Sequence, residues 1–529
     1  MSRFFRFPTK TALAVALISI GFTQSAMADA FLPGNLIVSR TLYAGTAATV
    51  TVGQTLPGGG TAITNGSFPN VFKNETPDAA FGVTAPIFLD QLSQRGSLIS
   101  TTAINSSLIT TSFASKSELA LNVSTDGKSI SFMGYAAPIN TLDVSNSNTA
   151  AVFDSTNPVK LTIARAVANV NLSTGNLQVT DVNAYSGNNG RAAVLANGQY
   201  YMVGNAGNGS GNGSVLSQLS NNTGVQSIAA GASGNTTAVG AAQGTFGSAT
   251  GYQTGFSLAQ VADPAHPGQK YAADKTGKDD NFRGMTVSNN TLFVTKGSGS
   301  NGVNSVYQVG ATGALANGGV ISNATISILP GFNSLSEKVA ETTATLKATP
   351  HPFGLYFGDA NTLFVADEGD NVRMGVAGKV TTFSGLQEWK LSNGTWTLDQ
   401  TFQSGLVGQV SAPSGLAWNV QQDGLRNITG EKNADGSFTI FGTTSTVSNE
   451  LTHDLGGDPN EIVSITIGAN STALNTSFSV LETAVAGQRF GGVVLAPVSA
   501  VPEPETYGML LAGLGLLGFM ARRKKSNQA

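Results

Sequence analysis

The chain has 529 residues, and charged residues make up only 11% of them. Its formal net charge of -3 excludes the extended positive field that nucleic-acid backbones attract, so nucleic acid is not an expected partner. The sequence has no cysteine, which excludes disulfides, thiolate zinc sites and iron-sulfur clusters.

The N-terminal segment has the layout of a secretory signal peptide. A positively charged leader is followed by an apolar run over residues 11–22 and by the small residues Ala26 and Ala28. Signal peptidase reads small residues at this spacing, so we expect residues 1–28 to be removed on export. A membrane anchor is the alternative, but the run is too short to span about 30 Å of hydrocarbon.

Residues 29–499 are predicted to form one all-β domain. Short apolar runs alternate with turn-rich stretches, and no amphipathic helical pattern of a dozen residues occurs. Two stretches read as copies of one unit: residues 282–294 and residues 352–365 each contain two apolar runs joined by an Asn-containing turn. Looser copies surround the turns Asp126-Gly127 and Asn197-Gly198, a strong signal for hairpins.

A glycine followed by a hydrophobic strand recurs at Gly284, Gly354 and Gly415. These glycines are 70 and then 61 residues apart. Repeats of this length are typical of β-propeller blades, in which such a glycine allows close backbone approach near the central channel. We expect six or seven blades, with seven preferred, and the early strand over residues 35–39 completing the last blade. A β-helix would need shorter periods, and a pair of β-sandwiches would not explain the recurring glycine.

Two short motifs carry a family resemblance. The opening His351-Pro352-Phe353-Gly354-Leu355 and the run Leu363-Phe364-Val365-Ala366-Asp367 resemble the NHL and gluconolactonase-like propellers. This resemblance implies a propeller fold. It does not carry catalytic residues over to this chain.

One acidic segment is a candidate calcium site. It consists of Asp367, Glu368, Asp370 and Asn371 and follows the end of a predicted strand. Ca²⁺ takes several oxygen ligands from flexible loops, but an ordinary turn uses the same residue types. The three histidines, His266, His351 and His453, are far apart in the sequence, so we expect them to form hydrogen bonds in loops or turns.

Arginines near the predicted blade openings or loops have two interpretations. Arg191, Arg283, Arg373 and Arg489 could line one face and bind carboxylates or sugars. Alternatively, each could hold a loop by donating to backbone carbonyls. The sequence contains neither a G-x-S-x-G nucleophile motif nor a P-loop, so we predict no catalytic residue.

The C-terminal segment, residues 500–529, has three parts in a fixed order. Pro502, Glu503 and Pro504 are followed by an apolar run over residues 507–521. A basic cluster closes the segment, and it consists of Arg522, Arg523, Lys524 and Lys525. The run predicts a short hydrophobic helix with its basic end kept on the cytoplasmic side.

This order resembles the PEP-CTERM family of sorting signals. The resemblance implies an intermediate in the inner membrane and an exosortase that cuts near the Pro-Glu-Pro motif. The body is then released to the cell surface or extracellular matrix. An anchor that is never cut is the alternative.

We therefore expect an exported surface or matrix protein with a non-catalytic binding or structural role, linked to exopolysaccharide or biofilm. One alternative is an extracellular Ca²⁺-dependent propeller hydrolase or lyase that acts on sugars or lactones. Another is a self-associating structural protein. Enzymatic activity stays open, with the non-catalytic role preferred.

Overall fold

The structure is a computed structural model. It describes residues 31–74, 81–115, 117–207, 218–219, 221–239, 280–297, 302–316, 324–333, 349–370, 383–448 and 457–498. The predicted signal peptide and the C-terminal segment from residue 500 onward lie outside these residues, as do Asn371, Arg373, His266 and His453. Within the described ranges, no helix is long and apolar enough to cross a membrane.

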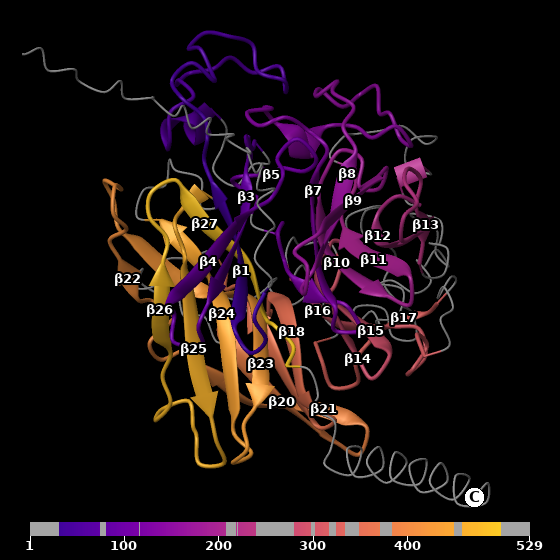
Figure 1. Cartoon of the computed structure of the whole chain (residues 1–529), viewed down its shortest axis with the longest axis vertical. Coiled ribbons are helices and arrows are strands. Elements are labelled where there is room, and N and C mark those ends of the chain that lie inside the picture. The colour runs from indigo at the N-terminus through magenta and orange to yellow at the C-terminus, as the bar shows by residue number, and fades with distance from the viewer. Residues whose placement is uncertain are drawn as a thin grey trace, which may run out of the picture.

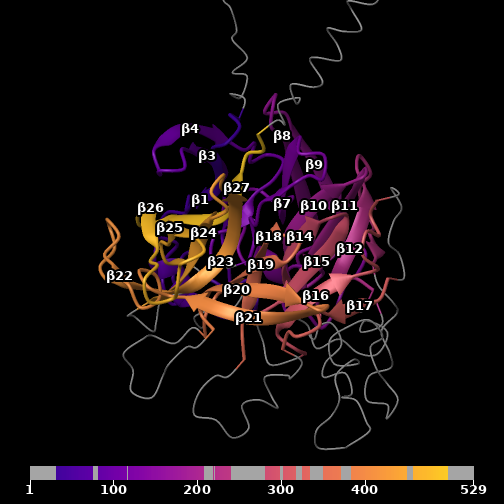
Figure 2. The ribbon, with the colours of Figure 1, turned by 90° about the horizontal axis from the view of Figure 1, so that it is seen from below.

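Six sheets follow one another around the molecule as the blades of a β-propeller (Figures 1 and 2). Blade 1 contains, in spatial order, β27 (Gln488–Leu495), β1 (Leu36–Leu42), β3 (Ile87–Leu92) and β4 (Leu98–Ala103). Blade 2 contains β6 (Asn122–Val123), β7 (Ser129–Tyr135), β8 (Arg165–Asn171) and β9 (Leu177–Val182). Blade 3 contains β10 (Gly190–Ala196), β11 (Gln199–Gly204), β12 (Gly224–Ala229) and β13 (Thr237–Ala238).

Blades 4 and 5 have the same four-stranded plan, and blade 6 has a fifth strand. Blade 4 contains β14 (Phe282–Ser288), β15 (Thr291–Lys296), β16 (Ser305–Val309) and β17 (Ile326–Ile328). Blade 5 contains β18 (Pro352–Asp359), β19 (Thr362–Asp367), β20 (Gly385–Ser392) and β21 (Thr395–Phe402). Blade 6 contains β22 (Val410–Ser411), β23 (Val420–Lys432), β24 (Phe438–Ser448), β25 (Glu461–Ile467) and β26 (Ser479–Thr483).

Apolar side chains join each blade to the next and so close the ring. One buried cluster lies between each pair of neighbouring blades, six in all. Between blades 3 and 4, for example, Val194 and Val203 pack with Phe282 and Met285. Each fully buried large aliphatic or aromatic side chain contributes about 1.5–3 kcal/mol through loss of its apolar surface from water.

Strand burial follows position within a blade. Strands β7, β15 and β19 are buried along their whole length because blades cover both of their faces. The outermost strands β4 and β26 are mostly exposed. Strands β7, β15 and β19 are the second of their blades, and they need apolar or satisfied polar side chains on both faces, which explains their continuous hydrophobic runs in the sequence.

The ends of the chain close blade 1. Strand β27 pairs antiparallel with β1, with Leu36 opposite Leu495 and Leu42 opposite Gln488. The early strand over residues 35–39 is predicted to complete the blade at the end of the chain, and β1 does lie in one sheet with the last strand, β27. The paired units 282–294 and 352–365 are also confirmed, as β14 with β15 and β18 with β19.

The preferred count of seven blades is wrong, because the described residues form six. The error arises partly at Gly415, which was expected to open a blade. This glycine instead lies in the turn between β22 and β23, with a φ of 85°. The inner strand of blade 6 begins afterwards, at Val420.

The glycines Gly284 and Gly354 lie where neighbouring inner strands approach each other, as predicted. A Cβ atom on Gly284 would lie 1.9 Å from the carbonyl oxygen of Phe353 in blade 5. On Gly354 it would lie 2.7 Å from the carbonyl oxygen of Arg426 in blade 6. Only a residue without a side chain allows these contacts.

We call the face of the ring at which the inner strands begin the upper face. The chain leaves β1 at this face and forms a lobe over residues 43–74 and 81–85, in which Tyr43, Phe68 and Phe72 make aromatic contacts with one another and with Phe113. This lobe includes the 3-10 turn η1 (Asn70–Asn74) and the short strand β2 (Thr84–Ala85), which pairs with β5 (Thr111–Ser112). A second lobe, residues 136–164, follows β7 and contains η2 (Val144–Asn146). Both lobes lie at the top of Figure 1.

Candidate binding site at the upper face

The inner strands share an irregularity near the upper face. The register shifts by one residue at Arg191 in β10, at Arg426 in β23, and across Arg283 and Gly284 in β14. Similar shifts occur in β18 and β27. Such bulges change the direction of the side chains that they contain. In three blades the bulge therefore sets the direction of an arginine.

These arginines are unusually buried for charged residues. Arg191 and Arg426 are each 3% exposed, Arg489 of β27 is 4% exposed, and Arg283 is half-buried. Taking a guanidinium out of water is costly unless its donors and charge find partners. The contacts of each arginine therefore indicate what role it has.

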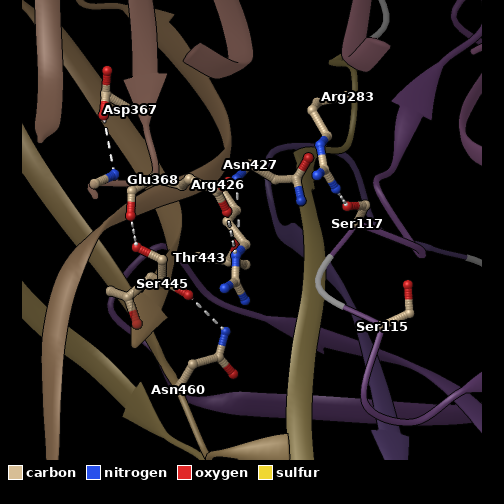
Figure 3. A network of polar contacts seen from close by, with 12 residues as sticks. Ser115, Ser117, Arg283, Asp367, Glu368, Arg426, Asn427, Thr443, Ser445 and Asn460 are labelled. Atoms are coloured by element: carbon tan, nitrogen blue, oxygen red, sulfur yellow. Dashed lines mark hydrogen bonds and ion pairs between the residues drawn. The ribbon is translucent and has the colours of Figure 1, made fainter. Parts of the chain in front are cut away.

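Arg283 reaches across the ring. Its Nη1 donates a hydrogen bond to the Oγ of Ser117 (Figure 3). Arg283 belongs to blade 4 and Ser117 precedes blade 2, so the contact joins two parts of the ring that are not neighbouring blades. The Cζ atom of Arg283 also lies 6.0 Å from the ring centroid of Phe353, in blade 5. The guanidinium thus lies within reach of both blade 5 and the segment before blade 2.

Arg191 lies beside this group. Its Nη1 donates to the Oδ1 of Asn281 and, at 2.8 Å, to the carbonyl oxygen of Phe282. Its Nε is buried and has no hydrogen-bond partner among the described residues. Burial lowers the pKa of Arg191 well below its usual value, and the positive charge of Arg283 lowers it further.

Arg426 forms a buried ion pair with Glu368, which follows β19. The Nε of Arg426 lies 3.3 Å from the Oε2 of Glu368, and their side chains are 3% and 4% exposed. Figure 3 shows this pair near Ser445, whose Oγ donates to the carbonyl oxygen of Glu368. The Nη2 of Arg426 has no hydrogen-bond partner within the part of the chain that the structure describes.

Arg489 fits the structural interpretation. Its Nη1 donates to the carbonyl oxygens of Phe113, at 3.1 Å, and of Ser115. These contacts connect blade 1 to the segment that leads into blade 2. The prediction that such arginines hold loops therefore describes Arg489, whereas Arg191 and Arg283 fit it only in part.

The predicted calcium residues are largely engaged with the protein. The Oδ2 of Asp367 accepts hydrogen bonds from the backbone N–H of His351 at 2.7 Å and from Gln387 at 3.1 Å, and its Oδ1 accepts from Gly369 at 3.0 Å. Burial raises the pKa of Asp367 despite these hydrogen bonds. Asp370 is buried nearby, and Asn371 lies outside the described residues.

Calcium binding at this segment stays a prediction. The described residues contain no group of three or more His, Asp or Glu side chains that could hold a metal ion. A bound ion would therefore have to replace some contacts of Asp367 and Glu368 or recruit backbone oxygens.

The sequence analysis missed Glu118, a buried carboxyl group at the start of blade 2. It accepts hydrogen bonds from the Oγ1 of Thr111 at 2.8 Å, the backbone N–H of Ser112 at 3.0 Å and the hydroxyl of Tyr135. Burial raises the pKa of Glu118, and these hydrogen bonds partly offset the effect.

It also missed Arg426, Asn189 and Asn205. Arg426 could have been found from the pattern of an arginine near a predicted inner strand. Asn189 and Asn205 flank the strands of a predicted hairpin, but asparagine is so common in this chain that no signal marks them.

Comparison with known proteins gives one specific result. Residues 500–524 match the family model of the PEP-CTERM protein-sorting motif. The chain carries a PEP-CTERM sorting motif. Such a motif indicates a protein that is exported, crosses the membrane and is sorted to the cell surface, and it implies processing by an exosortase. The prediction made from Pro502, Glu503 and Pro504 is confirmed.

No curated protein matches the sequence. Among solved structures, a glucose dehydrogenase is similar with 10% identity and a TM-score of 0.33, over 75% of this chain and 95% of that one. A polysaccharide lyase has 10% identity and a TM-score of 0.32, over 77% and 80%. A candidate 6-phosphogluconolactonase of Bacteroides fragilis has 9% identity and a TM-score of 0.30, over 86% and 98%. With such low TM-scores these likenesses carry no argument, and the propeller assignment rests on the strand order.

Proposed function

We propose that this protein is a surface or extracellular-matrix protein whose propeller binds a polysaccharide at its upper face and catalyses no reaction. The observation that carries the proposal is the group of buried arginines, contributed by separate blades, whose donors are only partly used. Arg191 and Arg426 each keep a buried N–H group without a partner among the described residues. Buried donors of this kind are normally satisfied, so they favour a ligand.

The contacts of the nearby carboxylates support a binding role over catalysis. Glu368 is paired with Arg426, and Asp367 is held by backbone N–H groups. A general base needs an oxygen within reach of the substrate, whereas these carboxylates already contact other groups of the protein. The sorting motif indicates sorting to the cell surface, which supports an extracellular partner.

The proposal is tested by retention of the purified full chain on exopolysaccharide isolated from the host. We expect R191Q to reduce the apparent affinity about tenfold, which corresponds to about 1.4 kcal/mol. The matched control is K128Q, which removes one positive charge from a side chain that is 77% exposed, in the hairpin turn between β6 and β7. Equal retention of the wild type, R191Q and K128Q would contradict a role for this face. Failure of the wild type to bind would contradict the function itself.

A further inference from the structure

Three residues of blade 3 that each carry a buried polar atom are neighbours along the chain or across the sheet. Arg191 is in β10, Asn189 immediately precedes this strand, and Asn205 immediately follows β11. The backbone N–H of Asn205 donates to the carbonyl oxygen of Asn189 at 3.1 Å, so the two asparagines are neighbours across the sheet. The Nδ2 of Asn189 donates to the Oγ of Ser115 at 3.0 Å and to Glu118 at 3.4 Å.

Each of these side chains has an unmet hydrogen-bonding atom. The Nε of Arg191 is a buried donor without an acceptor, and the Oδ1 atoms of Asn189 and Asn205 are buried acceptors without a donor, among the described residues. An unsatisfied buried polar group costs about 1–3 kcal/mol. Three such groups on one patch therefore indicate a molecule that supplies both an acceptor and donors.

The positive charges near Arg191 indicate which ligand group would accept a hydrogen bond from its Nε. Arg191 has no carboxylate as a hydrogen-bond partner in the described structure, since its contacts are to Asn281 and to a carbonyl oxygen. The guanidinium of Arg283 adds a second positive charge close enough to lower the pKa of Arg191. The acidic neighbour Glu118 already accepts hydrogen bonds from Thr111, Ser112 and Tyr135. An external anion would accept a hydrogen bond from the Nε of Arg191, and a planar carboxylate matches the geometry of a guanidinium.

The Oδ1 atoms of Asn189 and Asn205 indicate which donor groups the ligand would have. They require N–H or O–H groups, and an anion alone has none. A carboxylate that carries neighbouring hydroxyl groups satisfies all three atoms at once. Sugar acids have this combination.

We infer that Arg191, Arg283, Asn189 and Asn205 form a subsite for a uronate unit, in which the carboxylate binds the arginines and the sugar hydroxyl groups donate to the asparagines. This inference rests on the proposed function and narrows it to acidic polysaccharides. It also assigns separate roles to the two residue types, which can be tested separately.

The test is calorimetric titration of the full chain with three probes: a galacturonate oligomer, a neutral galactose oligomer of similar length and free galacturonate. We expect the acidic oligomer to bind at least about tenfold more tightly than the neutral one. We expect R191K, which keeps the charge but loses the Nε–H group of the guanidinium, to lose about tenfold in affinity for the acidic oligomer. The N205L variant should weaken binding of both the acidic oligomer and free galacturonate, because it removes the acceptor for a hydroxyl group.

The outcomes separate the subsite from the function. Equal binding of acidic and neutral oligomers would overturn the carboxylate subsite, while retention on native exopolysaccharide would leave the proposed function standing. If R191K and N205L bound the galacturonate oligomer as tightly as the wild type does, the proposed location of the subsite would be wrong. S117A removes the contact that holds Arg283 across the ring and tests the same site if R191K fails to fold. If the protein bound free galacturonate but not the oligomer, the site would be one for a soluble sugar acid. The inference that it binds an acidic polysaccharide would then be wrong.

Discussion

Two ion pairs connect blades 5 and 6, and they differ mainly in burial. Arg426 and Glu368 are 3.3 Å apart with side chains 3% and 4% exposed, whereas Lys432 and Asp359 are 2.9 Å apart with side chains 49% and 36% exposed. We predict that E368Q destabilises the protein by about 3–5 kcal/mol, because it leaves a buried guanidinium without its counter-charge. The same chemical change at the exposed pair, D359N, should cost about 0–1 kcal/mol.

The magnitudes follow from the surroundings of each pair rather than from distance. At an effective dielectric constant of about 20, charges this far apart attract by about 5 kcal/mol, and water screens most of that attraction at the exposed pair. The buried pair has already lost its hydration. Removal of one partner therefore leaves the other charge with the full free-energy cost of burial and without an ion pair to offset it. The double variant E368L/R426M should recover most of the lost stability, because no buried charge remains.

Equilibrium unfolding in urea measures all four proteins under the same conditions. Circular dichroism reports the loss of strand structure, and agreement with tryptophan fluorescence checks that unfolding is a single transition. Similar, small losses for E368Q and D359N would refute the argument from burial. So would a double variant that is no more stable than E368Q.

Three further predictions concern the fold and the candidate metal site. Because burial raises the pKa of Glu118, the folded state binds the proton of this carboxyl group more tightly than the unfolded chain does. The unfolding free energy of the wild type should therefore rise relative to that of E118Q as the pH falls from 7 toward the ordinary pKa range of carboxyl groups. A relative fall, measured by urea titration at each pH, would contradict this. G284A should destabilise the ring by about 1–3 kcal/mol or more because its Cβ would meet the carbonyl oxygen of Phe353 at 1.9 Å, whereas G60A, at a position with open space, should be nearly neutral in the same assay. If the predicted calcium segment is a site, added Ca²⁺ should raise the Tm of the wild type and shift D370N less, and equal shifts would remove Asp370 from the ligand set.

Much of the fold followed from local sequence patterns. The Asp126-Gly127 and Asn197-Gly198 turns and the repeated opening with Gly284 and Gly354 have short-range causes, namely turn chemistry and close backbone approach. Gly415 has the same local pattern but a different role, because it forms the turn before β23. A glycine in a turn and a glycine at a contact between blades look alike until the neighbouring blade is known.

The candidate site was predictable only in part. The expectation that arginines gather on one face agrees with the positions of Arg191, Arg283 and Arg489. Their partners come from other blades and are far away in the sequence, as with Arg283 and Ser117. The pairing of Arg426 with Glu368 likewise depends on a contact between blades, which no local pattern encodes. Thr111, Ser112 and Tyr135, which donate to Glu118, lie within 17 residues of it, but its burial depends on the packing of those segments.

Strand β27 also fixes the side of the ring to which the sorting motif is joined. It runs from Arg489 at the upper face to Leu495 at the opposite end, where Ala496 and Asn35 are hydrogen bonded at 2.8 Å. The described chain ends at residue 498 on this side of the ring, and the sorting motif matched at residues 500–524 follows directly. The motif is therefore joined to the ring on the side opposite the arginines, so a contact of the motif with another molecule leaves the arginine-bearing face uncovered.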